Sequence, residues 1–438
     1  MTTHHLREAR AAAAWTWLAV IFLAGCGAAE PAPPPPPTLE QSLGMAVPHL
    51  MAARPVDVEM RVEAGVRWVR RDIAWARVEQ EVGVFDFTEA DAVIDAEVAA
   101  GVQVLVLLDY GHPAYAAESN GDVMVPPDDL ADFGRYAETV AEHFRGRVSA
   151  YELWNEPNFS IFWKPAPSPE GYAALAAVAA ESVRLTDPDA TILLGGTLGN
   201  WDPLSYDGRP WGFLEEVLVA QPDLLERVDV LAFHPYTWLQ QELPETPSGS
   251  VDPLQVSFVD MITDLRRITA AHGRPEIPLW STEQGFHTAT KLIFSRGVSE
   301  ELQGHLLVRT TLLALAQGVD KVFHFTYQDG LGDLYDKESH FGVVRHPSLS
   351  PDGEAPEPKP AYWSHQVLAS KLEDTVAVHD LREDLDLASD VFAFRLQSTD
   401  GDDTVVAWTT SGSATPLTLD GAPRDLTDAP LYVPISPP

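Results

Sequence analysis

The segment "GVQVLVLLDYGHPAYAAESNGDVMVPPDDLADFGRYAETVAEHFRGRVSAYELWNEP" (101–157) contains one complete strand–helix–strand unit. Its apolar runs, "VQVLVLL" (102–108) and "VSAYELW" (148–154), are mostly continuous rather than alternating, which is typical of parallel strands buried on both faces. Between them, residues 126–146 show a helical pattern with acidic residues in the first turn. The segment therefore predicts two parallel strands joined by a helix.

The same unit recurs along the chain. Further apolar runs are "LGMAV" (43–47), "VRWVR" (66–70), "TILLGG" (191–196), "VDVLAF" (228–233), "IPLWST" (277–282) and "KVFHFT" (321–326). Further helical patterns cover 87–101, 168–188, 298–318 and 359–374. Eight strands alternating with helices predict an α/β protein with a (β/α)8 TIM barrel over residues 40–374. A doubly wound open sheet is the alternative, but it usually has fewer units, and no G-x-G-x-x-G follows the first run.

The pattern of apolar runs and turn residues changes after residue 374. "VFAFRLQ" (391–397), "DTVVAWTT" (403–410), "ATPLTL" (414–419) and "LYVPIS" (431–436) are short runs separated by Asp, Gly, Ser and Pro. Such runs predict short strands joined by tight turns. We expect residues 375–438 to form a small C-terminal β-sandwich domain.

The N-terminus has the pattern of a targeting signal. Two arginines precede "AAAAWTWLAVIFLAG" (11–25), which is too short to span a membrane comfortably. "LAGC" (23–26) resembles the bacterial lipoprotein signal, with Cys26 as the acylated residue. We expect residues 1–25 to be the signal peptide and residues 26–39, which contain "EPAPPPPPT" (30–38), to be a Pro-rich linker. An ordinary secretory signal with an incidental thiol is the alternative. The lipoprotein interpretation places the protein in the bacterial cell envelope, anchored to a membrane only by its lipid.

Composition limits the partners. The chain has 438 residues, of which 45% are hydrophobic, which is enough for a large core. Its formal net charge of −36 disfavours nucleic acid and anionic membrane surfaces. Cys26 is the single cysteine, so no intrachain disulfide can form.

Active sites of such barrels lie where the strands end. The polar and aromatic residues at or just after the predicted strand ends are Arg70, Asp72, Trp75, Asp109, Tyr110, His112, Asn155, Glu156, His234, Tyr236, Glu283, Tyr327, Gln328 and Asp329. Glu156 and Glu283 follow the fourth and seventh runs, which face each other across a barrel of this size. Two carboxylates roughly 5 Å apart are the catalytic pair of a retaining glycosidase.

Several motifs carry a resemblance to a known family. "WNEP" (154–157), "STEQG" (281–285), "HPY" (234–236) and an arginine on the second run resemble clan A of the glycoside hydrolases. The nearer resemblance is to glycoside hydrolase family 39, and within it to bacterial membrane-associated hydrolases of exopolysaccharide. "VRRDIAWARVE" (69–79), "LLDYGHPAY" (107–115), "YELWNEPNFSIFW" (151–163) and "AFHPY" (232–236) are similar to that group. The resemblance covers about residues 40–374.

The resemblance implies roles for matched residues. Glu156 would be the general acid/base and Glu283 the nucleophile. Asn155 would hydrogen-bond the sugar 2-hydroxyl. A nucleophilic carboxylate needs a depressed pKa, and a catalytic acid needs a raised one.

The resemblance also implies the residues that support the nucleophile. Tyr236 would donate to its carboxylate, Arg70 would keep that carboxylate ionised, and His234 would line the subsite. The eighth run ends in "FHFTYQD" (323–329), without the tryptophan that often forms the sugar platform in this clan. Tyr327 is the expected substitute.

Each of these residue types also has a structural interpretation. Either glutamate could cap a salt-bridge network, and Glu152, inside the fourth run, is better explained as a buried partner for an arginine. His112 could line a subsite or hold a loop. Trp163 and Trp280 could be sugar-stacking platforms or core anchors.

These observations predict a retaining glycoside hydrolase that cleaves O-glycosidic bonds by double displacement. A non-catalytic carbohydrate-binding barrel protein and a transglycosylase on the same polymer are the alternatives. We expect a monomer whose substrate is a neutral polysaccharide or oligosaccharide, because the net charge of −36 repels polyanions. No group of His, Asp and Glu has metal-ligand spacing and no Gly-rich phosphate loop is present, so we expect neither a catalytic metal nor a cofactor.

Overall fold

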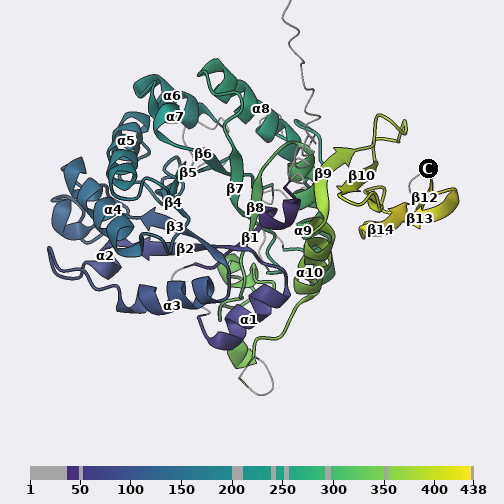
Figure 1. The fold of residues 1–438 in the computed structure, drawn as a ribbon, viewed down its shortest axis with the longest axis horizontal. Coiled ribbons are helices and arrows are strands. Elements are labelled where there is room, and N and C mark those ends of the chain that lie inside the picture. Colours follow the sequence, from purple (N-terminus) through teal and green to yellow (C-terminus); the bar gives the residue numbers. More distant parts are fainter. Residues whose placement is uncertain are drawn as a thin grey trace, which may run out of the picture. The chain divides into compact units, whose positions relative to one another are not determined.

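A computed structural model of the chain describes residues 37–48, 53–199, 211–237, 243–250, 256–291, 297–349, 353 and 355–435. The fold class is confirmed: eight parallel strands close into a barrel in chain order (Figure 1). All eight predicted strands are present. They are β1 (Leu43–Ala46), β2 (Trp68–Ala74), β3 (Gln103–Asp109), β4 (Ala150–Leu153), β5 (Thr191–Leu198), β6 (Val230–His234), β7 (Leu279–Gln284) and β8 (Lys321–Phe325).

Helices surround the barrel (Figure 1). They are α1 (Pro55–Glu63), α2 (Trp75–Val78), α3 (Thr88–Ala99), α4 (Leu130–Phe144), α5 (Pro169–Thr186), α6 (Gly212–Ala220), α7 (Leu224–Arg227), α8 (Phe258–Ala271), α9 (Glu300–Ala316) and α10 (Pro360–Leu372). The five predicted helices correspond to α3, α4, α5, α9 and α10. Side-chain caps fix several starts: Asp129 accepts from Ala131 N at 3.0 Å before α4, and Ser168 accepts from Gly171 N at 3.0 Å before α5.

The barrel interior is built in layers, because alternate residues of each strand point inward. The layer at the amino ends of the strands is apolar and consists of Trp68, Leu105, Ala150, Leu193, Val230, Ala232, Trp280 and Phe323. Two residues further along four of these strands, the same alternation puts polar side chains inside, namely Arg70, Glu152, His234 and Thr282. The barrel is therefore closed by an apolar plug at one end and carries buried charge towards the other.

The C-terminal part is a β domain. Strands β9 (Thr375–Asp380), β10 (Val391–Ser398), β11 (Asp403–Thr409) and β14 (Leu431–Ile435) form an antiparallel sheet in the order β14-β11-β10-β9. A hairpin, β12 (Thr415–Leu419) and β13 (Ala422–Leu426), covers one face of this sheet with two leucines, Leu419 and Leu426. The sequence predicted β10, β11, β12 and β14 but not β9 or β13.

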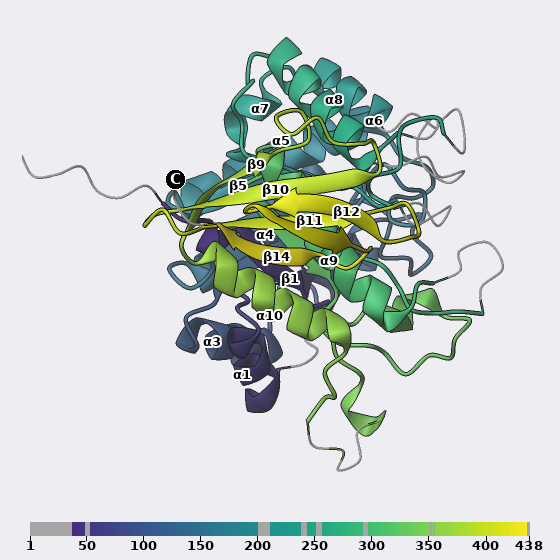
Figure 2. The same cartoon turned by 90° about the vertical axis from the view of Figure 1, so that its right-hand side faces the viewer.

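The other face of the sheet packs on the barrel, with the sheet lying against α9 and α10 (Figure 2). Phe394 and Trp408 on this face belong to the main hydrophobic core. The Trp408 indole donates to Glu245 at 2.9 Å, and Arg309 on α9 binds the same carboxylate through its Nε at 2.6 Å. The side chains of Arg309 and Glu245 are both buried. Removing one of them should therefore lower the free energy of unfolding by on the order of 3–5 kcal/mol. The β domain is thus tied to the segment that follows β6.

Cys26, the predicted signal peptide and most of the predicted linker lie outside the described residues. Within the described part of the chain, none of the helices combines the length and apolar character needed to cross a bilayer.

Candidate active site

The turn after β4 places Glu156 through two unfavourable backbone conformations. Trp154 has φ +69° and Glu156 has φ +44°, both in the left-handed region that costs a side-chain-bearing residue roughly 1 kcal/mol or more. Hydrogen bonds hold the turn in this shape. The Trp154 indole donates to Phe162 O at 2.9 Å, and the Glu156 amide donates to Gly196 O on β5 at 3.0 Å. The strand end is therefore shaped to present the Glu156 side chain.

Glu283, at the end of β7, is held at both carboxylate oxygens. Tyr236 donates its hydroxyl to Oε1 at 2.7 Å, and Arg70 donates Nη1 to Oε2 at 3.0 Å. Arg70 itself is fixed by Glu152, which accepts from Nε at 2.7 Å, and by Asn155, whose Oδ1 accepts from Nη2 at 2.9 Å. Glu152 is therefore the buried arginine partner that the sequence predicted.

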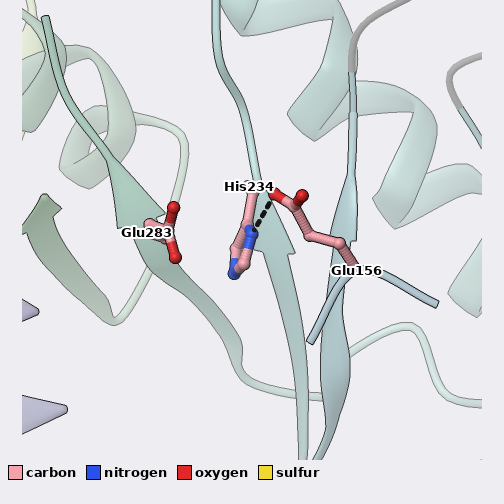
Figure 3. A group of neighbouring side chains, drawn as sticks. All are labelled: Glu156, His234 and Glu283. Atoms are coloured by element: carbon pink, nitrogen blue, oxygen red, sulfur yellow. Dashed lines mark hydrogen bonds and ion pairs between the residues drawn. The ribbon is translucent and has the colours of Figure 1, made fainter. Parts of the chain in front are cut away.

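The two candidate catalytic carboxylates approach each other across the barrel mouth. Ligand atoms of Glu156, His234 and Glu283 all lie within 4.8 Å of one another. Figure 3 shows His234 between the two glutamates, with its hydrogen bond to Glu156. Carboxyl groups about 5 Å apart suit direct attack by one of them, whereas inverting enzymes need a wider gap of about 6.5–9.5 Å for a water molecule.

The pKa of Glu283 departs from the expectation of a depressed value. Burial raises it, and the carboxylate of Glu156 raises it further, while His234, Arg70 and the Tyr236 hydroxyl lower it. The net direction is upward because the desolvation of the carboxyl group outweighs the groups that favour its ionised form. By contrast, Arg70 and His234 outweigh the burial of Glu152 and lower its pKa to about 2.

Hydrogen bonds around His234 fix where its protons lie. Glu152 is ionised and can only accept, so the Thr282 hydroxyl donates to its Oε1 at 3.0 Å. Thr282 must then accept from His234 Nε2, 3.1 Å away, which places a proton on that nitrogen. Burial alone would lower the pKa of His234, but the carboxylates of Glu283, Glu152 and Glu156 raise it to about 9. His234 is therefore an imidazolium at neutral pH, and its Nδ1 donates to Glu156 Oε1 at 2.8 Å.

The same proton arrangement argues against a metal ion here. Glu156, His234 and Glu283 are close enough together to hold one. A ligating histidine must offer an unprotonated nitrogen. Nδ1 of His234 faces Glu156 and Nε2 faces Thr282, so coordination would require the ring to lose a proton and break one of these bonds. The donor set fits a protonated network better than a metal centre.

A cleft of about 370 Å³ opens above the carboxylates, within the usual size range of small-molecule sites. It is lined by Asn155, Glu156, Phe159, Ile161, Phe162, Leu198, Tyr236, Glu283, Lys337, Glu338 and Phe341. Phe159, Ile161 and Phe162 come from the loop after β4. The apolar residues of "NFSIFW" (158–163) were the sequence signal that could have identified them as part of the cleft. Lys337, Glu338 and Phe341 come from the long segment after β8, where no sequence pattern singled them out.

His112 and Trp163, two of the predicted binding residues, are not among the residues that line this cleft. His112 holds a loop: its Nε2 contacts Glu79 O at 2.7 Å, and its Nδ1 accepts from Ala114 N. Trp163 packs against Trp154, with ring centroids 5.1 Å apart, inside the main core. Both residues therefore have the structural roles considered as alternatives: His112 holds a loop, and Trp163 is part of the core.

Trp280 and Tyr327 are also buried away from the cleft. Trp280 belongs to the apolar plug at the amino ends of the strands, 5.2 Å from the ring of Trp68, because it precedes the end of β7 by four residues. Tyr327 is 1% exposed and lies under the guanidinium of Arg61. The expectation that Tyr327 replaces a tryptophan platform is therefore wrong.

Solved structures with the same barrel fold include glycoside hydrolases. A family 39 glycoside hydrolase from Bacteroides cellulosilyticus WH2 superposes with a TM-score of 0.70 at 20% identity, covering 91% of this chain and 82% of that one. A monomeric beta-xylosidase from Caulobacter crescentus CB15 gives a TM-score of 0.60 at 19% identity, covering 88% and 76%. The resemblance to family 39 of clan A is confirmed at the level of the fold.

Sequence comparison adds a shorter match. No protein-family model matches the chain. A beta-xylosidase from Geobacillus stearothermophilus is 29% identical over 119 residues, which is 24% of this chain. The match spans 23% of the length of that relative. Activity and substrate therefore rest on the chemistry of the site.

Proposed function

We propose that the protein is a retaining glycoside hydrolase that cleaves O-glycosidic bonds in a polysaccharide or oligosaccharide. The observation that carries this proposal is the approach of the Glu156 and Glu283 carboxylates to within 4.8 Å at the base of a cleft. An oxygen–oxygen approach of this size is near the roughly 5 Å separation of a retaining pair and supports attack by a carboxylate. The family 39 hydrolase and the beta-xylosidases with the same fold support the same chemistry.

In the first step, a Glu283 oxygen attacks the anomeric carbon while the bond to the leaving oxygen breaks. Glu156 gives its proton to that oxygen, so the leaving group departs as an alcohol. The His234 imidazolium donates to Oε1 of Glu156, which leaves Oε2 to carry the transferable proton. After the transfer, the cation of His234 stabilises the new Glu156 carboxylate.

In the second step, Glu156 accepts a proton from water, whose oxygen attacks the same carbon and displaces Glu283. Two displacements at one carbon restore its configuration. Arg70 and Tyr236 hold the departing carboxylate in place through Oε2 and Oε1. Asn155, fixed by Arg70 and by its contact with the Tyr110 hydroxyl at 3.1 Å, is placed at the cleft wall to bind a sugar hydroxyl.

A transglycosylase is the main alternative, because it uses the same residues and passes the glycosyl group to a sugar instead of water. A carbohydrate-binding barrel without turnover is less well supported. Such a protein has no need for a second carboxylate in the cleft, and burying it beside Glu156 is costly. The arginine, tyrosine and histidine that favour the ionised form of Glu283 are features of a site arranged for chemistry.

We also propose that the protein is a lipoprotein of the bacterial cell envelope, anchored through Cys26. Support comes from the apolar run before the only cysteine and from the proline-rich segment after it. We propose a neutral polymer as substrate, because the net charge of −36 repels polyanions.

The experiment that tests the proposed activity is a panel of aryl glycosides and neutral and uronate-rich polysaccharides, with analysis of the products. We expect sugar release from at least one neutral substrate, and none when Glu156 and Glu283 are both replaced by glutamine. No release from any substrate by the wild-type chain would overturn the proposal. Longer products in place of shorter ones would favour the transglycosylase.

A further inference from the structure

Strands β4 and β5 separate at the level of the candidate acid. Their regular pairing ends with Leu153 opposite Leu194. Beyond this point the chain of β4 turns into the loop that carries Glu156, whereas β5 continues to Leu198. The backbone groups at the end of β5 therefore need partners other than a β4 strand, because an unpaired buried amide or carbonyl is costly.

Asn158, two residues after Glu156, supplies these partners at Leu198. Its Nδ2 donates to Leu198 O at 2.8 Å, and its Oδ1 accepts from Leu198 N at 2.9 Å. One side chain thus binds both backbone groups of this residue, in the place of a neighbouring strand. Asn158 is 2% exposed, so water has little access to compete for these bonds.

The end of β5 also leads to His234. Leu198 is the register partner of His234 in the pairing of β5 with β6, and Gly199 N donates to His234 O at 3.0 Å. His234 in turn donates its Nδ1 to Glu156 at 2.8 Å (Figure 3). A closed ring of contacts therefore joins the loop of Glu156 to β5 through Asn158, β5 to β6, and β6 back to the Glu156 carboxyl group.

The turn that carries Glu156 needs support of this kind. Trp154 and Glu156 both have positive φ, which is unfavourable for residues with a side chain. At Glu156 the turn is bound to β5 by the backbone bond to Gly196 O, and after Glu156 it is bound to β5 by Asn158. Loss of the second attachment would let the turn relax and move the Glu156 carboxyl group away from His234.

We propose that Asn158 is a positioning residue: through its bonds to β5 it holds the Glu156 carboxyl group against His234. The proposal rests on the proposed function, because it takes Glu156 as the acid and base of the reaction. Asn158 is not among the residues that line the cleft, so it acts only through the geometry of Glu156. Its loss should weaken proton donation to the leaving group more than attack by Glu283.

The test is NMR of the Nδ1 proton of His234 in protein labelled with 15N-histidine. A buried ring proton that is hydrogen-bonded to a carboxyl group resonates far downfield, and its absence from the spectrum of His234→Gln identifies the signal. Asn158→Leu removes both amide bonds and should shift this signal upfield or broaden it beyond detection. Asn158→Asp keeps the side-chain shape, which guards against a loss of the fold, but a carboxylate cannot donate to Leu198 O. It should shift the signal in the same direction.

Gln303→Met is the matched control, because it also removes a buried amide that binds backbone. Gln303 is 4% exposed, and its Nε2 donates to Phe286 O at 2.8 Å and to Phe341 O at 3.1 Å, in the segments after β7 and β8. This variant should leave the His234 signal in place. The proposal is overturned if the signal is unchanged in the Asn158 variants, if Gln303→Met changes it equally, or if the wild type shows no downfield signal.

A kinetic measurement separates this role from a general loss of stability. In Asn158→Leu, kcat/KM should fall about tenfold or more on a phenyl glycoside, whose leaving group needs a proton. It should fall less than about twofold on the 2,4-dinitrophenyl glycoside of the same sugar, whose leaving group needs none. Equal losses on both substrates would contradict the proposal. The NMR measurement needs no turnover, so a wild type that is inactive in the substrate panel would overturn the proposed function, and the NMR result would still decide the role of Asn158.

Discussion

Tyr236→Phe removes one hydroxyl from the candidate active site while keeping the aromatic ring. The lost hydrogen bond is 2.7 Å long and ends on Glu283 Oε1. A hydrogen bond to a charged group contributes about 1.5–3 kcal/mol, which corresponds to roughly a tenfold to hundredfold loss in kcat/KM. The hydroxyl also lowers the pKa of Glu283, so its removal should raise that pKa.

The assay is the pH profile of kcat/KM on an activated aryl glycoside. Glu283 must be ionised to attack, so a higher pKa moves the acid limb of the profile to higher pH. Tyr327→Phe is the matched control, because Tyr327 is fully buried outside the cleft and its hydroxyl has no hydrogen-bond partner among the described residues. Tyr327→Phe should change neither rate nor profile. An unshifted acid limb in Tyr236→Phe, or an equal change in both variants, would refute the assignment of Tyr236 to the nucleophile.

Further predictions concern the carboxylates, the histidine and the anchor. Glu283→Ala should abolish turnover, and added azide should restore part of it by forming a glycosyl azide. Glu156→Ala should still cleave substrates with good leaving groups, because these need no acid in the first step. Equal losses of activity in both folded variants, with no rescue by azide, would contradict these roles. The raised pKa of His234 stabilises the fold fully below about pH 6.5, and this contribution of at most about 3 kcal/mol should disappear as the pH rises through about 9. Urea unfolding of wild type and His234→Gln across that range measures it, and parallel pH curves would speak against it. Cys26→Ser should release the protein from membranes with unchanged activity, and a variant that still sediments with membranes would show that the anchor lies elsewhere.

The fold could be predicted from the sequence because most barrel strands are short, nearly continuous apolar runs. Such a run is the direct consequence of burial on both faces. The apolar runs also fixed the strand ends within a few residues, which is why Glu156 and Glu283 could be placed opposite each other. Strand β9 (Thr375–Asp380) was missed because its burial pattern has no regular alternation.

Sequence position was a poor guide to which aromatic residues face the cleft. Trp280 was placed near a strand end, but it lies four residues before the end of β7 and fills the plug layer instead. Tyr327 follows β8 directly, but its ring packs under Arg61 in the core. The direction of a side chain after a strand depends on the turn that follows, and a periodic pattern carries no information about it.

The charges of the site were also only partly predictable. An arginine and a tyrosine near Glu283 were expected, and both are hydrogen-bonded to it. The net rise in the pKa of Glu283 was not expected, because desolvation depends on the surrounding walls rather than on the identity of the partners. Glu338 was missed for a related reason, since its position depends on the path of the segment after β8.

The most direct test of the central claim is the configuration of the first-formed product. Proton NMR of an aryl β-glycoside reaction, recorded before mutarotation, distinguishes the two anomers by the signal of the anomeric proton. A double displacement through Glu283, with Glu156 as acid and base, predicts that the β-anomer appears first. Initial appearance of the α-anomer would contradict it, because inversion requires a single displacement by water.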